Sequence, residues 1–130
     1  MSGNFNTEII SPDKTILKTK TKLVTIPSYE GLMGILKDHI PLVTFLRPGI
    51  IELVSEEKDD KYFIEEGTVE FFNNNLLILT SSCKLLSNFS GEEIQIMIQN
   101  VEKEIVSNNL KDKQRYILSH KLETLKEIRQ

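Results

Sequence analysis

Cysteine, histidine and long apolar runs are scarce in this 130-residue chain. Cys83 is its single cysteine, so no internal disulfide can form, and a reducing compartment is the simplest expectation. No apolar run approaches the roughly 20 residues that a membrane-spanning helix needs. The segment at the N-terminus has neither a basic nor an apolar block, so no secretory signal is visible.

The chain also carries no net positive charge. The formal net charge is −3, which gives no basis for binding nucleic acid. Lys18, Lys20 and Lys22 alternate along one predicted strand. They are better explained as charges that prevent other strands from pairing with a sheet edge than as a site that binds phosphate groups. The mass of 14.9 kDa suits one domain, or a small domain with an appendage.

Glycine and proline disappear from the last third of the chain. All prolines, and all glycines except Gly91, precede residue 88. This change predicts turn-rich β-structure in residues 1–87 and helices in residues 88–130. We therefore expect an all-β N-terminal antiparallel β-sandwich or flattened barrel, followed by a C-terminal antiparallel α-helical hairpin.

Short β-branched and aromatic runs between turn signals predict the strands. These runs are residues 5–10, 15–26, 43–46, 50–55, 62–65, 68–72 and 76–81. Residues 30–44, with two glycines and a proline, predict a turn, a short buried strand and a second turn. The charged residues 56–61 predict a solvated hairpin loop, because no histidine or cysteine joins their carboxylates.

Two apolar stripes at helical spacing mark the C-terminal part. Ser90 and Glu93 predict a capping box at the start of the first helix. The first stripe contains Ile94, Met97, Ile98, Val101 and Ile105, and the second contains Leu118, Leu122, Leu125 and Ile128. Residues 107–109 are polar and separate the two helices, and the second is expected to begin near Lys111. The helices bury too little apolar surface to stand alone, so we expect them to dock on the sandwich or on a partner.

Catalytic chemistry has few candidates here. His39 and Cys83 could form a Cys–His nucleophilic pair. The simpler interpretation is that His39 is a turn or interface residue and that Cys83 is a buried or half-buried residue at the end of a strand. His120 falls in the charged second helix and is expected to be exposed. Metal-ligand clusters are missing, and Gly31-x-x-Gly34 lacks the spacing of a phosphate loop. The sequence predicts a binding or assembly protein.

One motif has a specific order: Glu30-Gly31, then Gly34-Ile35-Leu36, then His39-Ile40-Pro41-Leu42 and Thr44. This spacing resembles that of the epsilon subunit of F-type ATP synthases. Further matches, extending the resemblance over roughly residues 5–85, are Ile10-Ser11-Pro12, Pro48-Gly49-Ile50-Ile51, Gly67-x-Val69-Glu70 and Leu77-Ile78-Leu79-Thr80.

The resemblance implies a non-catalytic rotor subunit in the central stalk of a proton-translocating ATP synthase. In that family the sandwich binds the gamma subunit and the c-subunit ring, which couples ring rotation to the catalytic head. The helices can fold against the sandwich or reach the alpha/beta head and impede ATP hydrolysis. The family also implies a peripheral location on the cytoplasmic face of the bacterial inner membrane.

Two sets of residues match the family's interfaces. The set implied to face the c-ring is Glu30, Gly31, Leu32 and Met33. The set implied to lie near gamma is His39, Ile40, Pro41 and Leu42. Basic residues that could contact the acidic head from an extended second helix are Arg115, Lys121, Lys126 and Arg129, although a solvated helix face is the simpler interpretation.

The predicted helices depart from the family. They contain no alanine, whereas the family's helices are typically rich in it. Some bacterial members bind ATP through an Ile/Leu-Asp-x-x-Arg-Ala motif, in which Gln95 and Ile98 here replace the aspartate and the arginine. We therefore expect no ATP binding of the family type and no other cofactor. The alternative is a free-standing β-sandwich interaction module or, ranked lower, a hydrolase using Cys83 and His39.

Overall fold

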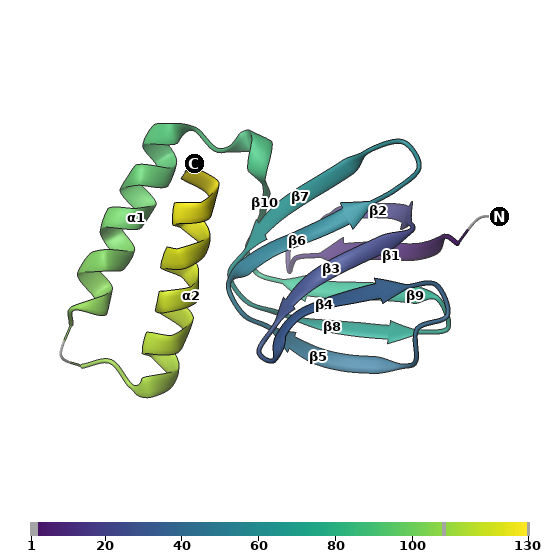
Figure 1. Ribbon diagram of the computed structural model, residues 1–130, viewed down its shortest axis with the longest axis horizontal. Helices are drawn as coiled ribbons and strands as arrows, with labels where there is room; N and C mark the ends of the chain where they lie inside the picture. The colour runs from purple at the N-terminus through teal and green to yellow at the C-terminus, as the bar shows by residue number, and fades with distance from the viewer. Residues whose placement is uncertain (1–2, 108, 130) are drawn as a thin grey trace.

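A computed structural model describes residues 3–107 and 109–129. Ten strands in this part of the chain form a β-sandwich, and two helices pack against one end of it (Figure 1). The strands are β1 (Phe5–Ile10), β2 (Thr15–Thr21), β3 (Leu23–Ser28), β4 (Gly31–Leu36), β5 (Leu42–Leu46), β6 (Gly49–Val54), β7 (Asp59–Ile64), β8 (Gly67–Phe72), β9 (Asn75–Thr80) and β10 (Cys83–Leu85). A 3-10 turn (Leu86–Asn88) leads to α1 (Gly91–Ile105) and α2 (Asp112–Arg129). The predicted fold class is confirmed.

The strands pair in the order β10-β7-β6-β3-β5-β8-β9-β1-β2, and β4 pairs with β3 outside this path. The path passes from one layer to the other between β3 and β5, where Ser28 pairs with Leu46. The described pairs are antiparallel except for β1 with β9. No local sequence pattern indicates that parallel pair, because most of the sandwich lies between its strands in the sequence.

The run 15–26 is two strands, so its prediction as one strand is wrong. β2 ends at Thr21, and the Lys22 amide donates to the Val54 carbonyl at 2.7 Å as the chain crosses to β3 in the other layer. No glycine or proline marks this crossing in the sequence. β3 also continues through Pro27 and Ser28, beyond the predicted end at residue 26. As predicted, Lys18 and Lys20 are exposed on an edge strand, β2.

Alternating side chains fill the space between the layers. The buried core residues are Phe5, Ile9, Val24, Ile26, Ile35, Leu46, Ile51, Leu53, Tyr62, Ile64, Val69, Phe71, Leu76 and Ile78. Gly67 allows β8 and β9 to approach closely, because a Cβ there would lie 2.5 Å from the Leu79 carbonyl oxygen. β4 was expected to be a buried strand, but only its Ile35 is buried and Leu32 and Leu36 are exposed. The reason is its position beside β3 alone, outside the main path of the sheet.

A second core joins the helices to the sandwich. Ser90 caps α1 as predicted: its hydroxyl accepts from the Glu93 amide at 3.1 Å, and its own amide donates to Glu93 Oε1 at 3.3 Å. Phe63 of β7 is buried among the two helical stripes, and the residues of this core are Phe63, Leu86, Phe89, Ile94, Met97, Ile98, Val101, Ile105, Leu118, Leu122, Leu125 and Ile128. Both stripes and the docking on the sandwich are therefore confirmed. Of the predicted break at 107–109, residue 108 lies outside the described residues.

Candidate protein-interaction surfaces

The outer face of β5, β8 and β9 is unusually apolar for a sheet that meets solvent. Strand register places Val43 opposite Glu70 and Phe45 opposite Thr68, while Leu42 and Leu46 point inward. The exposed fractions are 72% for Val43, 61% for Phe45, 65% for Phe72 and 44% for Leu79. Solvent-facing sides of antiparallel sheets normally carry polar residues, and a contiguous apolar patch marks an interaction site. We call this set the outer apolar face.

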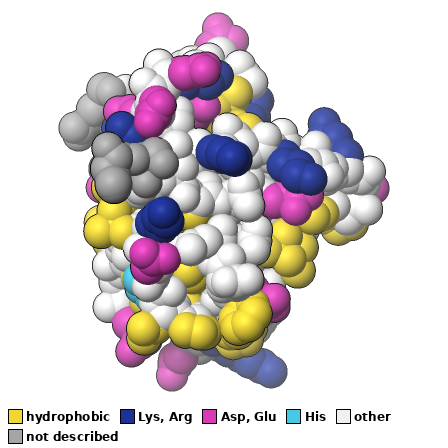
Figure 2. All heavy atoms as spheres, turned by 90° about the vertical axis from the view of Figure 1, so that its right-hand side faces the viewer, with side chains coloured by type: hydrophobic (Ala, Val, Ile, Leu, Met, Phe, Trp, Pro, Cys, Tyr) yellow, Lys and Arg dark blue, Asp and Glu magenta, His cyan; other side chains and the backbone are white. Residues whose placement is uncertain are grey.

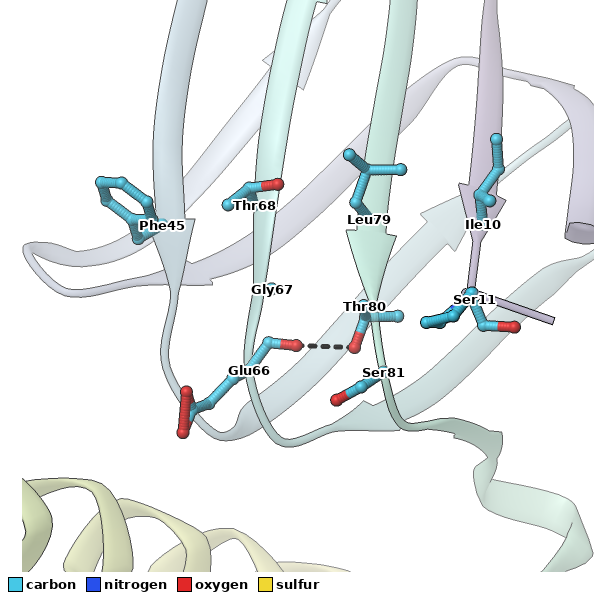
Figure 3. Close-up of a pocket in the computed structure, with 10 residues that line it drawn as sticks. Ile10, Ser11, Phe45, Glu66, Gly67, Thr68, Leu79, Thr80 and Ser81 are labelled. Atoms are coloured by element: carbon cyan, nitrogen blue, oxygen red, sulfur yellow. Dashed lines mark hydrogen bonds between the residues drawn. The ribbon is translucent and has the colours of Figure 1, made fainter. Parts of the chain in front are cut away.

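Two open hollows indent this layer. One, of about 670 Å³, is lined by Phe45 and Leu79 together with residues from the ends of β1 and β8. Figure 3 shows the residues that line this hollow, among which the Thr80 hydroxyl donates to the Glu66 carbonyl oxygen at 2.6 Å. The other, of about 560 Å³, lies among Lys18, Glu70 and Phe72. Shallow hollows on an apolar sheet suit the side chains of another protein better than they suit a small ligand, which usually needs enclosure.

The loop from β4 to β5 continues this surface at the end of the sandwich away from the helices (Figure 1). His39 is half-buried, with its ring edge-on to the Phe71 ring at 5.9 Å and its Nδ1 2.8 Å from the Ile40 carbonyl oxygen. Leu42 packs against the core. Ile40 is 74% exposed and Pro41 is also exposed. Hydrophobic side chains gather along the lower edge of this end of the molecule in Figure 2, at the level of β5 in Figure 1.

The β3–β4 turn carries the other predicted set at the opposite end of β4 (Figure 1). Glu30 is exposed, Leu32 is 72% exposed, and Met33 packs against the core. Gly31 has φ of 123°, a conformation that other residues rarely adopt. The Ser28 hydroxyl closes the turn by donating to the Gly31 carbonyl at 2.7 Å. At about 3.3 Å per residue, β4 separates the two predicted sets by roughly 20 Å, so they form two distinct surfaces.

Three contacts hold α2 to the sandwich beside that turn. The Tyr116 ring stacks on the Tyr29 ring with 5.7 Å between centroids and an interplanar angle of 29°. The Tyr116 hydroxyl donates to the Tyr29 carbonyl at 3.3 Å. Lys121 Nζ lies 2.6 Å from Glu65 Oε1, and these side chains are 19% and 36% exposed. The expected docking surface is therefore small and partly polar.

His120 lies within this contact, so its prediction as an exposed residue is wrong. Its ring meets the Tyr116 ring edge-on at 4.5 Å, and the residue is half-buried. The pKa of His120 is lowered, mainly by burial and to a smaller extent by the positive charge of Arg47. The negative charge of Glu123 raises it. Sequence alone missed this because Arg47 comes from the β5–β6 turn, far away in the chain.

Three basic residues of α2 have partners within the docked hairpin itself. Arg115 Nη1 donates to the Ile105 carbonyl at 2.8 Å, and Lys126 lies 3.9 Å from Glu102. Arg129 Nη1 donates to Gln95 Oε1 at 3.5 Å. The neighbouring Ile98 is 1% exposed in the core between the helices. The position of the ATP motif's arginine is thus occupied by a core residue.

A Cys–His nucleophilic pair is absent. Cys83 begins β10 at the helix end of the sandwich, whereas the His39 loop lies at the other end (Figure 1). Burial raises the pKa of Cys83 to about 12, so its thiol stays protonated and is a poor nucleophile. Residues 3–107 and 109–129 contain no cluster of three metal-ligating side chains. Neither α1 nor α2 is both long and apolar enough to cross a membrane.

Comparison with known proteins agrees with this geometry. Residues 4–85 match the family model described as "ATP synthase, Delta/Epsilon chain, beta-sandwich domain". The chain is 39% identical to the ATP synthase epsilon chain of Pelagibacter ubique over 98% of this chain and 99% of that protein. It is 30% identical to the epsilon chain of Parvibaculum lavamentivorans over 99% of this chain and 98% of that protein.

Solved structures share the fold. A chain in the Euglena gracilis mitochondrial ATP synthase, solved with OSCP, F1 and c-ring, superposes with a TM-score of 0.81 at 24% identity, covering 98% of this chain and 82% of that one. A chain in the central stalk and c-ring of Tetrahymena thermophila ATP synthase gives 0.69 at 13% identity, covering 96% of each. The likeness extends through both the sandwich and the helices.

Proposed function

Because this chain belongs to the family of ATP synthase epsilon chains, we propose that its sandwich joins the gamma subunit of that complex to the c-ring. The chain is a non-catalytic subunit of the central stalk of an F-type ATP synthase. Residues 1–87 form the part that connects gamma and the ring, and residues 88–130 form a regulatory hairpin. The two separate surfaces at the ends of β4 support this division between two partners.

The outer apolar face and the β4–β5 loop bind gamma. The observation that carries this proposal is the exposure of Val43, Phe45 and Phe72 on strands that otherwise bury their apolar side chains. Ile40 and Pro41 touch gamma directly, whereas His39 and Leu42 fix the loop from inside. Burying such a face on a partner is favourable by about 25 cal/mol for each Å² of apolar surface.

The β3–β4 turn faces the c-ring. Glu30 and Leu32 are the exposed residues that contact the ring, Gly31 supplies the left-handed backbone, and Met33 anchors the turn in the core. Membrane association arises through the assembled complex, on the cytoplasmic face of the bacterial inner membrane.

The hairpin is a switch that inhibits ATP hydrolysis when it leaves the sandwich. The small docking surface of α2 supports this proposal. Its three local contacts, the ion pair of α1 between Glu93 and Lys84 of β10, and one shared core are few enough for a partner to replace. Release would free Lys121 from Glu65, and this cation could then contact the alpha/beta head. The hairpin does not bind ATP in the family's manner, since Ile98 offers no charge and packs inward.

Co-expression with gamma tests the outer apolar face. Phe45→Asp places a charge on that face and is expected to reduce co-purification with gamma at least tenfold. Ile96→Asp is the matched control, because Ile96 is similarly exposed (57%) but lies on α1. Failure of the unaltered chain to co-purify with gamma would contradict the proposal, as would equal loss in both variants.

ATP hydrolysis by the assembled head tests the hairpin. Truncation after Phe89 should raise hydrolysis, whereas Tyr116→Ala in the full chain should lower it by favouring the released hairpin. Retained co-purification with gamma shows that the truncated sandwich is folded. Unchanged hydrolysis in both proteins would make the hairpin purely structural. For ATP, calorimetry on the isolated chain should detect no binding at sub-millimolar concentrations.

A further inference from the structure

Asp38 and Asn74 hydrogen-bond to each other in both directions, across two loops far apart in the sequence. The Asp38 amide donates to Asn74 Oδ1 at 2.7 Å, and Asn74 Nδ2 donates to Asp38 Oδ1 at 3.0 Å. Asp38 belongs to the loop between β4 and β5, and Asn74 to the turn between β8 and β9. We call this reciprocal pair the loop clip.

Both residues of the loop clip have left-handed backbone conformations. Asp38 has φ of 67° and Asn74 has φ of 61°. Glycine adopts this region with the least strain, while Asp and Asn tolerate it better than other side chains do. Glycine at either position would relieve the backbone, but it would remove the side chain that makes the clip. The chain has a non-glycine residue at both positions, and the side chains of both residues take part in the clip.

The loop clip lies beside exposed apolar residues of the candidate interaction surfaces. Ile40 is two residues after Asp38 and 74% exposed, and Phe72 is two residues before Asn74 and 65% exposed. The same turn is tied to a third segment, because the Asn74 carbonyl accepts from the Asn6 amide at 3.0 Å. His39, the residue after Asp38, rests on the Phe71 ring.

We propose that Asp38 and Asn74 are positioning residues, whose clip holds the β4–β5 loop on the β8–β9 turn and presents Ile40 and Phe72 as one rigid contact surface for gamma. The inference rests on the proposed function of this face. A loop that is already ordered loses less conformational freedom when a partner binds, so the clip strengthens binding without touching the partner.

Glycine substitutions in the full-length chain separate the clip from backbone strain. Asn74→Gly relieves a left-handed residue and removes both hydrogen bonds of the clip. Asp38→Gly relieves the other left-handed residue but removes only the bond from Asn74 Nδ2, because the amide of residue 38 can still donate to Asn74 Oδ1. Asn73→Gly is the matched control, because Asn73 has φ of 52° in the same turn but its side chain takes no part in the clip. Hydrogen exchange of residues 38–42 is measured in the free protein, and the dissociation constant for gamma is measured with the same variants.

We expect Asn74→Gly to speed exchange in the loop, and to weaken gamma binding, by about fivefold to tenfold. Asp38→Gly keeps one of the two hydrogen bonds, so its effect should be in the same direction but smaller. The double variant should be no worse than Asn74→Gly alone, because that single variant already removes both hydrogen bonds. Asn73→Gly should match the unaltered chain in both measurements.

Each contrary result has its own meaning. If Asn74→Gly leaves hydrogen exchange in the loop unchanged, the clip does not restrain the loop, whatever the affinity for gamma. Faster exchange with unaltered gamma affinity would overturn the positioning role while leaving gamma as the partner. Failure of the unaltered chain to bind gamma would instead overturn the proposed function, and with it the target of the clip.

Discussion

The Tyr116 ring of α2 stacks on the Tyr29 ring of the sandwich, one residue before the Glu30-Gly31 turn, with 5.7 Å between the ring centroids. The contact joins the hairpin to the turn that we assign to the c-ring. Movement of the hairpin therefore changes the surroundings of that turn. This relationship makes the docked helix and the ring-facing surface neighbours.

Removing the Tyr116 ring should loosen α2. Stacked aromatic pairs contribute about 0.5–1.5 kcal/mol beyond their burial, so Tyr116→Ala should speed hydrogen exchange along α2 by up to roughly tenfold. Tyr116→Phe keeps the stack and loses only the 3.3 Å hydrogen bond to Tyr29, so its effect should be much smaller. Equal exchange in all three proteins would show that the stack does not hold the helix.

Acidification should weaken the docked hairpin through His120. Its pKa in the folded protein lies below the ordinary 6.5 because of burial and Arg47. The unfolded chain therefore binds more protons in this range, and stability rises with pH. The stability that neutral His120 contributes is fully present above about pH 6.5. It is lost as the pH falls through the pKa of His120 in the folded protein. Denaturant unfolding at several pH values should show this slope, and His120→Gln should remove it.

Arg47→Gln provides a second check on the same histidine. Loss of the guanidinium should raise the pKa of His120 toward its ordinary value, as followed by the imidazole resonances in an NMR titration. Burial would still keep that pKa low, since burial is the larger cause. A His120 pKa at or above 6.5 in the unaltered protein would contradict this account.

Salt should weaken the contact between Lys121 and Glu65. The pair is partly exposed, so it contributes about 0.2–1 kcal/mol, less as ionic strength rises. Glu65→Gln should speed α2 exchange at low salt and reduce its salt dependence. Glu66→Gln removes the same charge from an exposed neighbour that is not paired with Lys121. If the two variants behave alike, net charge rather than this ion pair controls docking.

The capping box should account for part of the hairpin's stability. Ser90→Ala removes the acceptor for the Glu93 amide and should cost about 1 kcal/mol in the free energy of unfolding. Ser87→Ala is the control, because Ser87 is exposed in the preceding 3-10 turn. A comparable loss in both variants would mean that the cap has no special role.

Much of the fold follows from local patterns in the sequence. The loss of glycine and proline, the capping box and the stripes around Ile98 and Leu125 all indicate what the chain forms. The crossing at Lys22 and the parallel partner of β1 depend on distant strands. No local signal encodes them, so propensity and periodicity could not find them.

The sequence indicated only part of the candidate interaction surfaces. The β4–β5 loop could be named from its glycine, histidine and proline. The outer apolar face could not, although the pair Phe71-Phe72 held a clue: neighbours in a strand point to opposite faces, so one ring had to point outward. The contacts of Asp38 with Asn74 and of Tyr29 with Tyr116 join residues 36 and 87 positions apart.

The parallel pairing of β1 with β9 also determines when the sheet can form during translation. A ribosome delivers residues 6–10 first, and each of them pairs with a residue that is synthesised 69 positions later, in 75–79. Until then β1 can pair only with β2, and its other edge stays open to strands of other chains. A nascent chain stalled before β9 is thus expected to aggregate more readily than the full-length chain, because β9 covers this edge of β1.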